Sequence, residues 1–203
     1  MIKIENLEVV GIPHAIRGAR NPMNSWARSD SQSTIGPQDF KLLSSLCSAG
    51  PDHRKFMRMI VVYIDITAPL YWWKEFDTYK VGTVANSCST MHKIHDKEFV
   101  LSDFSHEKLS ESSLNCLNQT IQVLNEARVS FIQTKNKDFW WQMIQLLPSS
   151  FNQRRTVMLN FEVLSNIYKS RRAHKLQEWR DLCAFIESLP YAQLITTSAK
   201  GVV

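Results

Sequence analysis

Apolar and polar residues alternate at the beginning of the chain. The segment Ile2–Val10, with the sequence IKIENLEVV, has the period of two that is typical of a half-buried strand. A second strand is predicted over Phe56–Ile66, where β-branched and apolar residues dominate. A third, short strand is predicted at Glu98–Leu101. These segments are the strands that the sequence predicts.

Apolar residues at helical spacing occupy most of the remaining chain. They predict helices over Pro37–Ala49, Ala68–Lys80, Phe139–Leu147 and Leu176–Leu189. Two further helices are predicted from apolar stripes, one made by Leu114, Leu117, Ile121 and Leu124 and the other by Val157, Phe161, Leu164 and Tyr168. The second half is therefore expected to be mostly helical, and residues 1–203 are expected to form a single α/β domain.

The segment Gly11–Gly36 has no periodic pattern. It is rich in Gly, Pro, Asn, Ser and Arg, and it contains Ile16, Met23 and Trp26 as apolar residues that the fold can bury. A long loop without periodic structure is usually functional or disordered. A polar N-terminal binding loop over residues 11–36 is favoured over a flexible connection.

Composition excludes several classes of protein. Of the 203 residues, 44% are hydrophobic and 21% are charged, which excludes a wholly disordered, collagenous or coiled-coil chain. The formal charge of +5 favours anionic partners, but without a dense Lys/Arg run it does not favour nucleic acid. Apolar stretches such as Met59–Ile64 are too short to span a bilayer, and the first residues lack a signal-peptide core, so a cytoplasmic protein is expected.

Metal chemistry has little support in the sequence. The cysteines contain no Cys-x-x-Cys pair, and free thiols are expected at Cys47, Cys88, Cys116 and Cys183. His92 and His95 lie three residues apart, but without a placed third ligand they are expected to be surface histidines. We therefore predict no metal site.

General motif searches find no dinucleotide-binding turn, no P-loop and no nucleophile elbow. The aromatic side chains of Trp72, Trp73 and Phe76 are suited to stack on a planar ring. Because they have helical spacing, a place in the core is favoured.

A pair of polar residues near the C-terminus is more informative. Asn160 and Arg171 are eleven residues apart, so on one helix they share a face and flank the apolar stripe that includes Phe161 and Leu164. Polar groups at the border of a buried face line a cleft or serve helix capping and solvation. Taken alone, the pair leaves both interpretations open.

Two segments together resemble the flavin-dependent thymidylate synthases. That family has Ala-Pro, then Gln-Trp, then Arg-His-Arg-x-x-Ser, then Asn-Glu-x-Ser-x-Arg. Here Ala68-Pro69 matches without change and, after one extra residue, Asn86 and Ser89 match the Asn and the second Ser. Different residues stand at the other motif positions, namely Glu75-Phe76, Thr78-Tyr79-Lys80, Thr83, Ser87 and Met91, and Glu98–Leu101 resembles the strand that follows in the family.

The second segment is more specific. The family has Leu-Pro, then an Asn, a second Asn six residues later, an Arg five residues after that, and a Gln six residues further on. Asn160, Asn166, Arg171 and Gln177 stand at these spacings after Leu147-Pro148. The resemblance extends over about residues 49–189 and does not include the N-terminal segment.

The resemblance implies a fold and a chemistry. The implied fold is an α/β (α+β) core with a mixed sheet and a long helical second half, assembled as a homotetramer with sites at subunit interfaces. Each site of the family holds FAD, dUMP and methylenetetrahydrofolate. Since the flavin relays the one-carbon unit, no protein nucleophile is needed, and no catalytic residue is assigned.

The departures from the family lie where its cations bind anions. The Arg-His-Arg stretch of the family holds the flavin cofactor, and here Thr78, Tyr79 and Lys80 replace it, while Met91 replaces an Arg that helps to hold the nucleotide phosphate. Each lost charge-assisted hydrogen bond costs about 1.5–3 kcal/mol. Glu75 in place of Gln adds a negative charge, so FAD binding is in doubt.

Two functions follow from this pattern, and a third interpretation, a structural or interaction protein that only inherited the fold, stays open. One is a divergent FAD-dependent methyltransferase or hydroxymethyltransferase of a pyrimidine nucleotide such as dUMP. The other is a non-catalytic binder that senses or sequesters a nucleotide or a nucleotide-derived signal, as would suit a phage or mobile-element protein. The candidate ligand or cofactor residues are Asn160, Asn166, Arg171, Gln177, Asn86, Ser89, Lys80, Tyr79, Thr83, Glu75, Arg58, Arg17 and Arg20.

Overall fold

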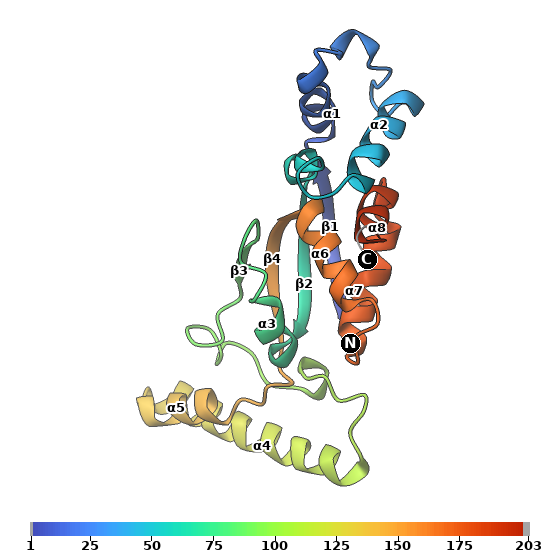
Figure 1. Ribbon diagram of the computed structural model, residues 1–203. Coiled ribbons are helices and arrows are strands. Elements are labelled where there is room, and N and C mark those ends of the chain that lie inside the picture. The colour runs from blue at the N-terminus through green and yellow to red at the C-terminus, as the bar shows by residue number, and fades with distance from the viewer. Residues whose placement is uncertain (1, 201–203) are drawn as a thin grey trace. The chain divides into compact units, whose positions relative to one another are not determined.

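The computed structural model describes residues 2–200, with side chains described as far as residue 197. Four strands form one sheet in the order β1-β2-β4-β3 (Figure 1). The helices and strands are β1 (Lys3–Val10), α1 (Ile12–Arg20), α2 (Pro37–Ser48), β2 (Val61–Pro69), α3 (Leu70–Phe76), β3 (Val84–Ser87), α4 (Glu111–Thr134), α5 (Lys137–Leu146), β4 (Asn152–Asn160), α6 (Phe161–Arg171), α7 (Gln177–Ser188) and α8 (Ala192–Lys200).

The residues group into two compact units, and each unit contains parts of the strands. The first unit contains the start of the chain together with Ile66–Thr78 and Asn86–Arg155. The second unit contains Ile4–Asp65, Tyr79–Ala85 and the chain from Thr156 onward. The prediction of a single domain over residues 1–203 stays a prediction.

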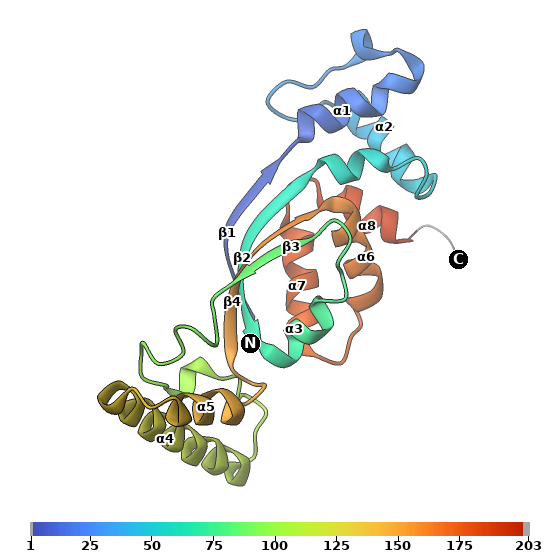
Figure 2. The same ribbon diagram turned by 90° about the vertical axis from the view of Figure 1, so that its left-hand side faces the viewer.

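The second unit is built on α6, α7 and α8. Figure 2 shows these helices together on one side of the strands of this unit. Helix α6 begins after Asn160, whose side-chain oxygen accepts a hydrogen bond from the backbone N–H of Val163 at 3.0 Å. The apolar side chains that these helices bury include Leu164, Ile167, Trp179, Leu182, Ile186, Leu194 and Ile195.

A glycine links β1 to α1 in the second unit. Gly11 has φ +93°, and a Cβ atom at this position would lie 2.0 Å from the carbonyl oxygen of Met59. Only glycine allows the backbones to approach this closely in a left-handed conformation. The close approach sets the start of α1 against the segment that precedes β2.

A buried ion pair fixes the segment between α1 and α2. The Nε and one Nη atom of Arg20 each lie 2.6 Å from the carboxylate of Asp39, which has no solvent exposure. The hydroxyls of Ser29 and Ser31 also donate to Asp39, each at 2.6 Å. Burial alone would raise the pKa of Asp39, but these hydrogen bonds and the Arg20 charge lower it to about 2. The segment 29–39 is thereby tied to α1.

The first unit has its own core. Helices α4 and α5 lie side by side (Figure 1). Leu117, Ile121 and Leu124 of α4 pack in one cluster with Met143 of α5. In α3, the side chains of Trp72, Trp73 and Phe76 are buried, as their helical spacing predicted.

Most elements expected from the sequence are confirmed. The first strand, the helix at residues 37–48 and the helices α5 and α7 occur close to their predicted bounds, and α4 contains the stripe predicted from Leu114 to Leu124. The α+β class is confirmed, and the four strands run antiparallel, so the sheet is not of the mixed type. The cysteines are free thiols, and burial raises the pKa of Cys47 to about 12.

The expectation of a loop over residues 11–36 is wrong for residues 12–20, which form α1. The helix was missed because it contains Pro13 and Gly18, which have low helix propensity, and because one of its three buried side chains is charged. The buried side chains are those of Ala15, Ile16 and Arg20. The second predicted strand begins later than expected, because residues 55–59 form a single 3-10 turn before β2.

Two further expectations are wrong near residues 100 and 160. Glu98–Leu101 is not a strand, because the Asn125 side chain hydrogen-bonds both backbone groups of Phe99. Val157 and Asn160 belong to β4, so the stripe through Val157 and Phe161 crosses from a strand into a helix. The patterns in the sequence predicted none of β3, β4 and the last helix, α8.

Candidate functional site

The C-terminal end of α6 holds a cluster of one cation and two aromatic rings. Arg171, the last residue of α6, donates a hydrogen bond from Nε to the hydroxyl of Tyr79 at 3.1 Å. The Arg171 guanidinium lies 4.6 Å from the ring centroid of Trp179, which is fully buried. The Tyr79 and Trp179 rings meet edge to face at 5.9 Å. We call Tyr79, Arg171 and Trp179 the arginine cluster.

The N-terminal end of α6 meets the same chain segment that supplies Tyr79. Gly82 has φ +76°, and a Cβ there would lie 2.9 Å from Nδ2 of Asn160 and 3.2 Å from Val163. Next to it, the hydroxyl of Thr83 is buried and has no hydrogen-bond partner within residues 2–197. The segment Tyr79–Ala85 therefore contacts α6 at both ends, which lie about 16 Å apart at 1.5 Å per residue.

The arginine cluster is suited to bind an anion. A guanidinium group presents donors in a planar fork that matches phosphate or carboxylate oxygens. Stacking on Trp179 and the bond to Tyr79 restrict the rotamers of Arg171, so little conformational freedom is left to lose on binding. Two of the residues predicted from the sequence, Tyr79 and Arg171, are thus in direct contact.

The other motif residues on this unit are spread around the helix. Asn160 caps α6, and Asn166 is exposed on α6 about 140° around the axis from Arg171. Gln177 begins α7, where its amide donates to Asp181 at 2.7 Å. Lys80 and Arg58 are both exposed. Four matches at family spacing therefore do not converge on one point within this unit.

The two N-terminal arginines have different surroundings. Arg20 is buried in its ion pair with Asp39, so its charge serves the fold. Arg17 is exposed, and one of its Nη atoms lies 3.1 Å from Nδ1 of His14. Of these two candidate ligand residues, Arg17 is the one that solvent reaches.

The first unit contains the remaining motif residues. The hydroxyl of Ser89 accepts hydrogen bonds from the backbone N–H groups of Met91 and His92, at 3.1 and 2.9 Å, and so closes a turn. Asn86 is exposed on β3, and Glu75 is half-buried on α3. Ser89 also lines a cavity of about 800 Å³. The cations in its lining are Lys3, Lys93, Lys97 and Arg154, and the acids are Glu98, Asp103 and Glu107.

Sequence reasoning missed two residues of the site. Trp179 was not predicted, although it lies only two positions after Gln177 and places an aromatic ring beside a motif residue. Gly82 was not singled out either, although a glycine inside a polar motif signals a positive φ or a close approach. The fold reveals both roles, because Trp179 packs against Tyr79 and Gly82 packs against Asn160, and each pair is distant in sequence.

Two classes of site find no support in the described structure. None of the helices within residues 2–200 has the length and apolarity that crossing a bilayer requires. Between residues 2 and 197, no group of three or more His, Cys, Asp or Glu side chains is placed to hold a metal ion. His95, one of the two histidines considered, packs edge to face on Phe131 at 4.8 Å.

No protein-family model matches the chain, and no curated protein matches its sequence. Solved structures do match over nearly the whole length. Thymidylate synthase X from Helicobacter pylori, with FAD and dUMP, is 17% identical with a TM-score of 0.74, covering 98% of this chain and 100% of that one. A second structure of the H. pylori flavin-dependent enzyme with FAD and dUMP has a TM-score of 0.72 at 16% identity, covering 96% and 98% of the two chains.

A related enzyme with a different description matches as well. The UMP/dUMP methylase PolB from Streptomyces cacaoi, bound with 5-Br dUMP, is 11% identical with a TM-score of 0.66, covering 98% of this chain and 93% of that one. At these identities the likeness is one of fold. The chain therefore has the fold of the flavin-dependent thymidylate synthases.

Proposed function

We propose that the chain binds a uridine nucleotide, UMP or dUMP, at the arginine cluster. The observation that supports this most is the geometry of Arg171, stacked on Trp179 and bonded to Tyr79 at the position where the family motif has its arginine. The matched solved structures are described with dUMP or a brominated dUMP bound. In the proposal, Arg171 contacts the phosphate and the exposed Lys80 supplies a second positive charge.

The cluster supplies binding energy without further reorganisation. A hydrogen bond from a charged donor to a phosphate contributes about 1.5–3 kcal/mol, and a bidentate contact provides two such bonds. At about 1.4 kcal/mol per decade of affinity, loss of the Arg171 contact weakens binding by at least tenfold. Asn160 and Gly82, at the other end of α6, fix the position of the segment that contains Tyr79 and Lys80.

The residues at the flavin-binding motif do not fit FAD in the manner of the family. Thr78 directs its hydroxyl to the backbone carbonyl of Glu75 at 2.7 Å, and Tyr79 is hydrogen-bonded to Arg171. Of the three motif positions, only Lys80 carries a positive charge that attracts a pyrophosphate. The buried, unpartnered hydroxyl of Thr83 does not replace two arginines. These positions therefore do not support a flavin held as the family holds it.

A second candidate function is flavin-dependent methylation of the bound nucleotide. It is favoured by the match over the full length of a synthase that holds FAD and dUMP together. This candidate requires FAD binding by the purified protein and, by the resemblance, assembly as a homotetramer. A yellow protein that forms a tetramer in light scattering supports it, whereas a colourless protein that takes up no FAD in titration excludes it.

Thermal unfolding with UMP and dUMP tests the first proposal. A ligand at 100 times its dissociation constant adds about 2.7 kcal/mol to the free energy of unfolding, which raises Tm by several degrees. Arg171→Ala should remove at least half of this rise, because a tenfold weaker affinity leaves about 1.4 kcal/mol of ligand stabilisation. Because the cation–aromatic contact contributes about 0.5–1 kcal/mol at a partly exposed site, the variant should still fold.

Arg172 provides the matched control. It is the next residue along the chain, is exposed, and points about 100° away from Arg171. Arg172→Ala should keep the nucleotide-induced rise in Tm. Equal behaviour of the two variants, or no rise for the wild type with either nucleotide, would refute nucleotide binding at the arginine cluster.

A further inference from the structure

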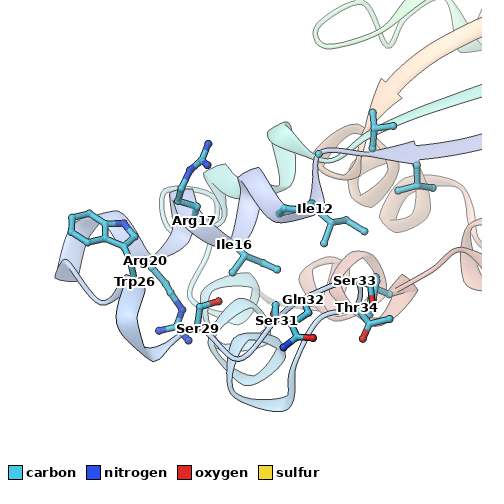
Figure 3. Close-up of a pocket in the computed structure, with 15 residues that line it drawn as sticks. Ile12, Ile16, Arg17, Arg20, Trp26, Ser29, Ser31, Gln32, Ser33 and Thr34 are labelled. Atoms are coloured by element: carbon cyan, nitrogen blue, oxygen red, sulfur yellow. The ribbon is translucent and has the colours of Figure 1, made fainter.

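The N-terminal segment of this chain encloses a cavity of about 570 Å³ within the second unit (Figure 3). Its walls come from the end of β1, from α1, from residues 26–34 and from Tyr191. None of the residues that line it belongs to the arginine cluster. A volume of this size is typical of pockets for small organic ligands.

Fixed interactions hold the cavity open. The carboxylate of Asp30 accepts hydrogen bonds from the backbone N–H groups of Gln38 and Asp39 at 2.8 and 3.0 Å. The Tyr191 hydroxyl accepts a hydrogen bond from the backbone N–H of Ile35 at 3.0 Å. Together with the Arg20–Asp39 ion pair, these bonds fasten both ends of the segment that forms one wall. The cavity is therefore formed before any ligand arrives.

The charges around the cavity do not balance. The lining contains two cations, Arg17 and Arg20, and no aspartate or glutamate. The charge of Arg20 is neutralised by Asp39, whose carboxylate also accepts hydrogen bonds from the hydroxyls of the lining residues Ser29 and Ser31. Among the described residues, Arg17 forms no ion pair, and one of its Nη atoms lies 3.1 Å from Nδ1 of His14. Arg17 is therefore the lining cation that has no carboxylate partner among the described residues. Its side chain points away from Ile12 and Ile16 in Figure 3, so it has to turn toward the cavity to meet a ligand.

The remaining walls are apolar and aromatic. Ile12 and Ile16 of α1 line the interior beside the segment that contains Ser31 and Gln32 (Figure 3). Trp26 lies at the rim and is half exposed, and its indole N–H donates to Asn21 at 2.8 Å, which fixes the ring. A fixed, half-exposed indole offers a face on which a planar group stacks.

We propose that this cavity binds a small organic anion that has a flat, apolar ring system and a single carboxylate, phosphate or sulfonate group. The ring lies against Ile12, Ile16 and Trp26, and the anionic group pairs with Arg17. Burial of the ring supplies most of the affinity, while Arg17 selects for negative charge. This site is independent of the proposed nucleotide site.

Fluorescence titration with 8-anilinonaphthalene-1-sulfonate tests the proposal, because this probe combines a flat ring system with one anionic group. Wild-type protein should bind it with saturation at one site. Arg17→Ala should weaken binding at least tenfold, and Ile12→Trp, which fills the cavity, should remove it. Should circular dichroism show that Ile12→Trp does not fold, Thr34→Trp, at an exposed lining position, replaces it.

Two matched controls distinguish this site from others. Arg28 is an exposed arginine of the same segment outside the lining, so Arg28→Ala should change affinity less than twofold. Arg171→Ala should also leave affinity unchanged, which separates this site from the nucleotide site. The uncharged analogue N-phenyl-1-naphthylamine should bind wild type and Arg17→Ala equally. Equal affinity of the sulfonate for Arg17→Ala and Arg28→Ala, or unchanged binding in the cavity-filled variant, overturns the proposal.

Competition then identifies the anionic group. In Arg171→Ala protein, where the nucleotide site is weakened, 1-naphthyl phosphate and indole-3-acetate are titrated against the bound probe. Displacement by 1-naphthyl phosphate supports a phosphate ligand, and displacement by indole-3-acetate supports a carboxylate ligand. If neither displaces the probe, carboxylates and phosphates are excluded and only a sulfonate ligand is supported.

Discussion

Arg20 and Arg171 each end a helix, but they have different surroundings in the folded chain. Both were expected to contact a ligand. Arg20 is buried against Asp39, nineteen residues further along the chain, whereas Arg171 stacks on Trp179 and bonds to Tyr79, ninety-two residues away. Residue identity and spacing predicted the cation at position 171, but the partners that decide its role come from the tertiary fold.

The ion pair of Arg20 makes stability depend on pH. The pKa of Asp39 is lowered from 3.8 to about 2 in the folded chain, so its stabilising contribution is present above pH 4 and is lost as the pH falls toward 2. A shift of this size corresponds to about 2.5 kcal/mol. Asp39→Asn should lower the free energy of unfolding by about 3–5 kcal/mol at pH 7, because Arg20 is left buried without a counter-charge.

Urea denaturation at pH 7, 4, 3 and 2 measures this effect. The difference between wild type and Asp39→Asn should shrink as the pH falls from 4 to 2. Asp52→Asn, at an exposed position, serves as the control and should differ little from wild type at every pH. A difference for Asp39→Asn that stays constant down to pH 2 would contradict the low pKa.

At the scale of elements, the sequence predicted the presence of helices better than the position at which a strand ends and a helix begins. The apolar residues Val157, Phe161 and Leu164 have helical spacing, yet β4 ends at Asn160. The hydrogen bond that the Asn160 side chain accepts from the backbone N–H of Val163 sets this boundary. In the sequence, its only sign is an Asn that precedes an apolar run. The strand itself was missed because the polar side chains of Gln153 and Arg155 share the face that Val157 and Leu159 bury.

Gly82 tests how the segment Tyr79–Ala85 sits on α6. Gly82→Ala forces an alanine into a left-handed conformation, at a cost of about 1–2 kcal/mol, and pushes its Cβ against Asn160. Gly50→Ala pays the same backbone cost at φ +108°, with no atom within 4 Å of the added Cβ. Both variants should lose stability in chemical denaturation, but only Gly82→Ala should weaken nucleotide affinity. Equal nucleotide affinity in the two variants would show that the segment Tyr79–Ala85 does not contribute to the nucleotide site.

At the scale of the molecule, motif spacing predicted the fold correctly. Ala68-Pro69 and the Asn160–Gln177 register indicated the fold that solved structures at 17% identity or less share over nearly the whole chain. The N-terminal segment was not predictable in the same way. Its structure depends on contacts of residues 20–35 with Asp39, in α2, and with Tyr191, which directly precedes α8. These contacts join residues from separate parts of the chain, so a local sequence pattern does not predict them.

Hydrogen exchange of the wild-type protein with and without dUMP tests the central claim most directly, because it locates the ligand. The account predicts slower exchange of backbone amides in residues 79–85 and at the junction of α6 and α7, residues 172–178, with no change in residues 12–36. Arg171→Ala should abolish this protection while leaving exchange of the free protein unaltered elsewhere. Protection confined to other residues, or no protection at saturating dUMP, would contradict the proposed nucleotide site.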